Sequence, residues 1–164
     1  MYGGWIIAIG VAIGGCDGGS GLNKAAAESA AAAPRVVSLQ GEAIELSKAL
    51  AALGLPSDDD QTKNQIVLRT NDGALIPLLK DEASRALFLD ERLRERPILI
   101  HARKRDKIAY LQVLTVQVKI EEAYREPQYY CEVCTITVRY PQVCPCCQGP
   151  MILKYKPEPG DPSR

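Results

Sequence analysis

The chain is poor in the residues on which most catalytic sites depend. Among its 164 residues there is one histidine, His101, and one phenylalanine, Phe88. Histidine is the side chain whose charge changes most readily near neutral pH, so its scarcity limits acid/base catalysis. It also leaves metal binding to the cysteines, and no glycine-rich phosphate-binding loop is present. These absences argue against an enzyme.

The chain also lacks a net charge. Lysine plus arginine and aspartate plus glutamate number 20 each, so no global field draws the protein toward nucleic acid or anionic lipid. Basic residues gather between positions 92 and 107, but acidic residues are mixed among them and aromatic residues are almost absent there. Single-strand-binding grooves need aromatic side chains on a basic surface. We therefore interpret this segment as a solvated charged face and expect no nucleic-acid partner.

No apolar run is long enough for a lasting transmembrane helix. The uncharged apolar run at residues 5–15 is about half the ~20 residues that span a bilayer, and it ends directly at Cys16. Such a run fits the core of an export signal peptide covering residues 1–15. A buried N-terminal strand is the alternative interpretation.

The four residues Ile13-Gly14-Gly15-Cys16 resemble the lipobox of bacterial lipoproteins. This resemblance implies cleavage before Cys16, lipidation of Cys16 with fatty acids such as palmitate, and a lipid anchor in the cell membrane on the periplasmic or extracytoplasmic side. The apolar run departs from typical signals because no lysine or arginine precedes it. Residues 16–34 are rich in glycine and alanine, which predicts a low-complexity tether.

The first half of residues 35–125 predicts strands and one helix. Residues 36–39 can form a strand, and the apolar spacing of residues 42–53 predicts a helix that Gly54 ends. Residues 65–70 and 74–79 flank Asn71-Asp72-Gly73, a strong hairpin signal. Pro77 cannot donate a ladder hydrogen bond, so it places the second strand at a sheet edge or a bulge.

The second half predicts a helix beginning near Asp81 and ending near Glu95, followed by a hairpin of residues 98–103 and 108–121. The whole region is therefore α+β and mainly β. Five strands with an interposed helix resemble a small OB-like barrel. A plain α+β sheet stays open as an alternative.

The clearest chemical motif lies within residues 126–156. Two Cys-x-x-Cys pairs, Cys131/Cys134 and Cys144/Cys147, are separated by nine residues. Two residues between cysteines allow a tight turn that aims both sulfurs at one ion, and two such turns supply four tetrahedral thiolates. This spacing predicts a structural zinc site, with the residues between the pairs forming a strand.

The second turn, Cys144-Pro145-Cys146-Cys147-Gln148-Gly149, follows the Cys-Pro-x-Cys-x-Gly form and resembles the zinc-ribbon and rubredoxin-like families over about 20 residues. The resemblance implies that the two cysteine pairs are the metal ligands. Thr135 stands where rubredoxins have glycine, and the gap between the pairs is shorter than theirs. Both departures favour zinc over redox-active iron. Cys146 is a spare thiol or a replacement for Cys144 or Cys147.

Other cysteine chemistry stays open. Disulfides persist outside the cytoplasm, so Cys131–Cys134 and Cys144–Cys147 could be oxidised or cross-linked. Cys-x-x-Cys can also exchange thiols and disulfides, although no thioredoxin-like βαβ pattern adjoins either pair. Beyond the motif, the proline-rich tail at residues 157–164 predicts disorder.

We therefore expect a membrane-tethered, exported binding or scaffold module with a structural zinc ion and a protein partner. The alternative is a rubredoxin-like electron-transfer or thiol-redox protein. Four thiolates leave the metal no open position, and the sequence pairs His101 with no nucleophile, so we expect no catalysis. The lipobox start and the cysteine-rich end together resemble uncharacterised lipoproteins of planctomycete-like bacteria.

Overall fold

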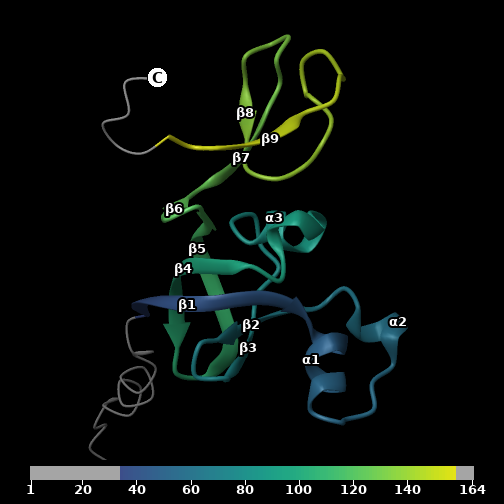
Figure 1. Ribbon diagram of the computed structural model, residues 1–164, viewed down its shortest axis with the longest axis vertical. Helices are drawn as coiled ribbons and strands as arrows, with labels where there is room; N and C mark the ends of the chain where they lie inside the picture. The colour runs from purple at the N-terminus through teal and green to yellow at the C-terminus, as the bar shows by residue number, and fades with distance from the viewer. Residues whose placement is uncertain (1–33, 158–164) are drawn as a thin grey trace, which may run out of the picture. The chain divides into compact units, whose positions relative to one another are not determined.

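The computed structural model describes residues 34–157, apart from the side chains of residues 59 and 61 (Figure 1). The predicted signal peptide, the lipidation at Cys16, and nearly all of the predicted tether and tail lie outside these residues. Strands dominate the described part. No helix within it is long and apolar enough to cross a membrane.

Six antiparallel strands form the larger sheet. Their order across the sheet is β3-β2-β1-β4-β5-β6. The strands are β1 (Arg35–Glu45), β2 (Ile66–Thr70), β3 (Leu75–Pro77), β4 (Pro97–Arg105), β5 (Ile108–Ile120) and β6 (Ala123–Arg125). Both predicted hairpins are present, β2–β3 around residues 71–74 and β4–β5 around Asp106 and Lys107. As Pro77 predicted, β3 is a short edge strand.

The helix predicted over residues 42–53 is wrong in its first four positions. Residues 42–45 continue β1 and pair with β2, and only α1 (Leu46–Ala52) is helical. Ala43 is fully buried in the main core, whereas Ile44 is buried in a second cluster with Ala49 and Val67. A strand buried on both faces lacks the alternation of apolar and polar residues that identifies a strand in a sequence. The apolar residues at 42–45 therefore resemble the first turn of the helix that follows.

Residues 56–64 contain a short helix, α2 (Asp59–Thr62). The predicted helix after Asp81 is much shorter than expected. It consists of α3 (Arg85–Leu89) and a 3-10 turn, η1 (Glu91–Leu93), separated by the extended residue Asp90. The Arg94 guanidinium donates to the carbonyls of Leu87 and Phe88 at 2.8 and 2.7 Å. These bonds satisfy carbonyls that a longer helix would have used, so α3 ends there.

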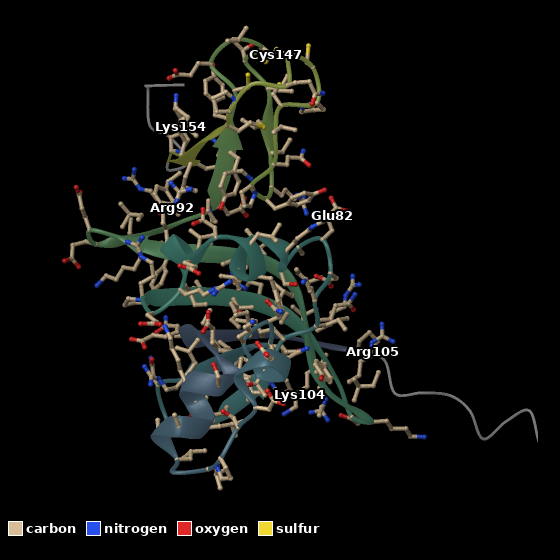
Figure 2. The ribbon with its side chains drawn as sticks, turned by 90° about the vertical axis from the view of Figure 1, so that its right-hand side faces the viewer. Glu82, Arg92, Lys104, Arg105, Cys147 and Lys154 are labelled. Atoms are coloured by element: carbon tan, nitrogen blue, oxygen red, sulfur yellow. The ribbon has the colours of Figure 1, made fainter. Side chains whose placement is uncertain are left out.

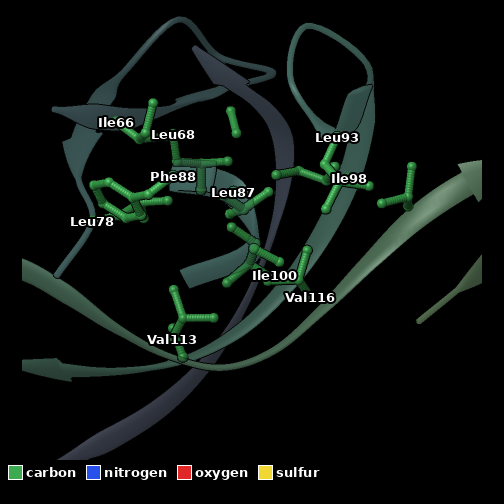
Figure 3. Packing of buried hydrophobic residues seen from close by; sticks show 14 of the residues in the cluster. Ile66, Leu68, Leu78, Leu87, Phe88, Leu93, Ile98, Ile100, Val113 and Val116 are labelled. Carbon is green, nitrogen blue, oxygen red and sulfur yellow. The ribbon is translucent and has the colours of Figure 1, made fainter. Parts of the chain in front are cut away.

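The main core lies between α3 and the sheet. Figure 3 shows Leu87 and Phe88 from α3 among the side chains of β2 and β4. The largest fully buried aliphatic residues are Ile66, Leu68, Leu78, Leu87, Leu93, Ile98, Ile100, Leu111, Val113 and Val118. Burying a side chain of this size contributes about 1.5–3 kcal/mol, so this cluster supplies most of the stabilisation available to the described region.

The larger sheet curls toward itself. Just after β3, Leu78 forms a parallel bridge with Leu111 of β5, and the Leu79 amide donates to the Leu111 carbonyl at 3.0 Å. The strand ladders of the described residues do not form a closed barrel. The α+β, mainly β class is therefore confirmed, whereas the OB-like barrel stays a prediction.

A smaller sheet carries the cysteine motif. Its order is β8-β7-β9, with β7 (Pro127–Tyr130) paired antiparallel to both β8 (Thr137–Val138) and β9 (Ile152–Tyr155). The strand predicted between the cysteine pairs is thus reduced to two residues. The backbone around it turns instead, with Thr135 at a φ of 56° and Pro141 ending any further pairing.

Gly41 marks the closest approach between β1 and β2. A Cβ atom at this position would lie 2.1 Å from the Arg69 carbonyl oxygen. We expect Gly41→Ala to lower the free energy of unfolding by about 1–3 kcal/mol, because backbone must shift to admit the methyl group. Chemical unfolding curves measure the change. Gln40→Ala, at the exposed neighbouring position, is the control, and equal stability of the two variants would contradict the steric argument.

Candidate metal centre

The two Cys-x-x-Cys pairs form two turns with the same backbone geometry. In the first, the Thr135 amide donates to the Cys131 carbonyl at 2.8 Å, and the Cys131 amide donates to the Ile136 carbonyl at 3.0 Å. In the second, the Gln148 amide donates to the Cys144 carbonyl at 2.9 Å, and the Cys144 amide donates to the Gly149 carbonyl at 2.9 Å. This repetition means that each pair of cysteines is presented by an independently formed local structure.

The fifth residue of each turn adopts a left-handed backbone conformation. The φ angles are 56° at Thr135 and 59° at Gln148. In each turn this conformation directs the carbonyl of the following residue back to the amide of the first cysteine, and glycine would adopt it without a steric cost. At the end of the second turn, a Cβ atom on Gly149 would lie 3.3 Å from the Cys147 sulfur. Glycine therefore leaves room for that sulfur.

The four sulfur atoms converge. The Sγ atoms of Cys131, Cys134, Cys144 and Cys147 all lie within 4.8 Å of one another, and those of Cys131 and Cys147 are 3.6 Å apart. Tetrahedral zinc with Zn–S bonds of about 2.3 Å places its sulfurs about 3.8 Å apart. The Cys131–Cys147 separation is much longer than the ~2.05 Å of a disulfide. The arrangement therefore fits a metal ion held by four thiolates.

Burial differs between the two members of each pair. Cys131 and Cys144 are 1% and 0% exposed, whereas Cys134 is half-buried and Cys147 is exposed. Cys146 is exposed and does not belong to the group of four. The first cysteine of each turn thus anchors the site, and the second closes it from the solvent side. Of its two predicted roles, Cys146 fits the spare thiol better.

Backbone amides act on the buried sulfurs. The Cys147 amide is the largest of several hydrogen-bonding influences that lower the pKa of Cys144 to about 7. At Cys131, the Cys134 amide favours the thiolate and lies 3.5 Å from the sulfur, but burial and the neighbouring thiols of Cys144 and Cys147 leave the pKa raised. Metal binding requires the sulfurs as thiolates, and the amides that favour the thiolate form at Cys144 and Cys131 act in that direction.

A buried tyrosine joins the metal-site sheet to the main core. Tyr129, on β7 two residues before Cys131, is 1% exposed, and its hydroxyl donates to the Asp90 carboxylate at 2.6 Å. Burial is the main cause that raises the pKa of Tyr129. Asp90 also accepts two hydrogen bonds from the Arg92 guanidinium, at 2.9 and 2.7 Å. No motif or periodicity predicts this contact, because Asp90 and Tyr129 are 39 positions apart in the chain.

The other tyrosines near the site pack against cations or the core. Tyr130 lies under the Lys154 ammonium and Tyr140 under the Arg85 guanidinium, at 4.1 and 4.5 Å from the ring centres. The structure also pairs His101 with a hydroxyl, since Ser38 Oγ lies 2.8 Å from its Nδ1. The sequence interpretation missed this pair, which is 63 residues apart in the chain.

Comparison of the chain with protein-family models, with curated proteins and with solved structures found no match.

Thr135→Gly is expected to stabilise the metal-loaded protein. A left-handed conformation costs a residue with a Cβ atom roughly 1–2 kcal/mol, and glycine adopts it freely. The gain should be about 1 kcal/mol, since glycine loses more entropy on folding. Chemical unfolding at saturating zinc measures it. Thr135→Ala keeps the Cβ atom and serves as the control, so an equal gain from alanine would contradict the explanation.

Tyr129→Phe is expected to lower the free energy of unfolding by about 1–3 kcal/mol near neutral pH, because it removes a donor from a buried carboxylate. Tyr110→Phe, at an exposed tyrosine, is the control. An equal change in the two variants would show that the Asp90 contact contributes nothing.

The same contact predicts a pH dependence. Burial acts to raise the pKa of Asp90, but hydrogen bonds from Arg92 and Tyr129 outweigh it and leave the pKa lowered. The ionised Asp90 carboxylate therefore stabilises the fold at pH values above its pKa in the unfolded chain, which is about 3.9. This stabilisation is lost as the pH falls through the lower pKa that Asp90 has in the folded chain. Asp90→Asn should therefore be less stable at neutral pH and lose less stability on acidification. Parallel acid slopes in the two proteins would contradict this.

Proposed function

We propose that the chain is an exported, lipid-anchored binding or scaffold module whose cysteine-bearing sheet holds one structural zinc ion. The observation that supports it best is the convergence of four sulfurs within 4.8 Å on two matching turns. Zinc bound by four thiolates has no open position for substrate. Its role would be to fix the two turns, so that metal binding contributes directly to folding.

The sequence of the first turn and the spacing of the cysteine pairs favour zinc, although the four ligands would also fit iron. Four cysteine thiolates bind either ion. Thr135 in place of glycine and the short gap between the pairs depart from the rubredoxin pattern. One observation supports the alternative electron-transfer or thiol-redox role: Cys147 and Cys146 are both exposed, so electrons or thiols from a partner could reach the site.

The larger sheet supports an OB-like assignment through its connectivity. Starting at β1, antiparallel pairing leads to β2 and β3, and the Leu78–Leu111 bridge then leads in parallel to β5. From β5 the pairing returns through β4 to β1, and α3 lies between β3 and β4 in the chain. We propose that this arrangement is a partly open barrel, with one bridge in place of a full ladder.

Exposed apolar side chains beside the cysteine turns support a protein partner. Val133 lies within the first turn and is 81% exposed, and Val143, directly before the second turn, is 59% exposed. Burying such side chains against a partner lowers the free energy of the complex, because apolar surface leaves water. A metal-fixed turn would present them in a defined geometry, as a scaffold or recognition surface requires.

The lipid anchor rests on the lipobox-like residues that end at Cys16. Mass spectrometry of the chain purified from bacterial membranes should find a peptide that begins at a lipidated Cys16. An unmodified peptide that includes residues 13–16 would refute the anchor and leave the metal proposal untouched.

Elemental analysis tests the metal proposal. The full chain, purified without added metal, should contain about one zinc per molecule. Cys131→Ser and Cys144→Ser remove the buried ligands and should abolish the stoichiometric zinc, whereas Cys146→Ser should retain it. Coloured protein with one iron per chain would favour the redox alternative. Metal-free protein with oxidised cysteines would refute both the zinc and the iron site and indicate disulfides.

A further inference from the structure

The β4–β5 hairpin and the start of β1 carry an exposed surface of positive charge. Residues 34–40 and 103–112 contain five cationic side chains, those of Arg35, Arg103, Lys104, Arg105 and Lys107. Asp106 is the one acid in these two segments, and it lies 3.8 Å from Arg35 in an ion pair open to solvent. Figure 2 shows Lys104 and Arg105 at this hairpin. The acids that balance the chain overall therefore do not neutralise this surface.

Apolar side chains share the surface. Val36, Ile108 and Tyr110 are 64%, 51% and 45% exposed. Register places Val36 opposite Arg103 and Ile108 opposite Arg105, and cross-strand partners project from the same face of a sheet. Ala102 and Val113, on the opposite face, are buried in the core. One outer face thus combines Arg103 and Arg105 with three exposed apolar residues, across a register irregularity between the two arginines. Arg35 and Lys104 pair with each other and project from the other face at the same end of the ribbon, and Lys107 lies in the turn. We call these eight residues at the tip of the ribbon the hairpin surface.

The chain enters the domain at this surface. Arg35 pairs with Lys104 in the first register position of β1. It follows Cys16 by nineteen positions, so covalent geometry keeps the two within about 65 Å. An anchor at Cys16 would hold the hairpin surface near the bilayer, where the effective concentration of lipid makes a weak contact sufficient.

We propose that the hairpin surface docks the domain onto anionic phospholipid. This deepens the proposed function, because it names the bilayer beside the lipid anchor as the partner of this face. Lysine and arginine would contact the headgroups, while Val36 and Ile108 enter the boundary between headgroups and acyl chains. Aliphatic side chains offer no stacking to bases, and Tyr110 alone provides an aromatic ring, so the surface fits lipid better than single-stranded nucleic acid.

Vesicle binding of the full chain with Cys16→Ser tests this docking without lipidation. The readout is the ratio of the binding constants for phosphatidylcholine vesicles with and without 30% phosphatidylglycerol. This ratio cancels any contribution from the apolar run at residues 5–15, which acts on both vesicles. We expect a clear preference for anionic vesicles that falls in high salt, because screening weakens attraction between exposed charges.

Matched double variants locate the contact. Each cation close to an anionic bilayer raises the binding constant by about fivefold, so Arg105→Gln/Lys107→Gln, beside Ile108, should reduce the ratio by up to about 25-fold. Lys48→Gln/Lys63→Gln removes two exposed lysines near α1 and α2 and should leave it within about twofold. Ile108→Gln should weaken binding to anionic vesicles.

Three outcomes would overturn the docking proposal: no preference for anionic vesicles, equal ratios for the two double variants, or tight oligonucleotide binding by a chain that ignores vesicles. Failure of the lipid anchor would appear separately, as unmodified Cys16 in the mass spectrum of the wild-type chain. Failure of the zinc site would appear in the elemental analysis.

Discussion

The Asp90 carboxylate is a buried charge on which several parts of the fold depend. It is 6% exposed and accepts hydrogen bonds from Tyr129, from the Arg92 amide and from the Arg92 guanidinium. A carboxylate this far from water is costly unless its lone pairs are satisfied, so the chain around it has little freedom. Asp90 interrupts the helical segment between α3 and η1, and it holds β7 through Tyr129. Because β7 leads directly into Cys131, the position of the first metal-site turn follows from this one carboxylate.

The segment that carries the cysteine turns, residues 126–156, has little apolar mass of its own and needs another source of order. Its principal fully buried side chain outside the cysteines is Tyr129, whose ring belongs to the main core. The partly buried side chains that pack against that core are Val138, Tyr140, Met151, Leu153 and Tyr155. Beyond these contacts, the turns are held by local hydrogen bonds and, as we propose, by a metal ion bound to the four sulfurs. A metal ion replaces a hydrophobic core in such segments. Thr135 and Gln148 have strained, left-handed backbones. A metal ion bound by the four sulfurs would offset the free-energy cost of this strain.

The features that sequence predicted correctly are local ones. Asparagine, aspartate and glycine at residues 71–73 determine the β2–β3 hairpin through their own backbone preferences, and the spacing of the cysteines brings the sulfurs together two at a time. Sequence failed where distant segments decide the structure. Residues 42–45 have apolar spacing that suits a helix, but pairing with β2 makes them a strand. Asp90 and Tyr129, like Ser38 and His101, meet only because the fold brings them together. No periodicity or motif carries that information.

The distribution of charge is a further feature that the sequence did not predict, because the acids mixed among the bases between residues 90 and 107 suggested a solvated charged face. The fold separates that mixture. Asp90 is buried and paired with Arg92, and Glu95 is paired with Lys48. The cations from Arg103 to Lys107 instead extend along a hairpin beside the start of β1. Net charge counted along the chain therefore understates the field at the hairpin surface, which depends on charges within about 8–10 Å. The hairpin surface is built from the β1–β4–β5 ladders and contains no metal-site residue. Its charge should therefore persist without metal, so the lipid docking and the metal-fixed recognition that we propose can vary independently.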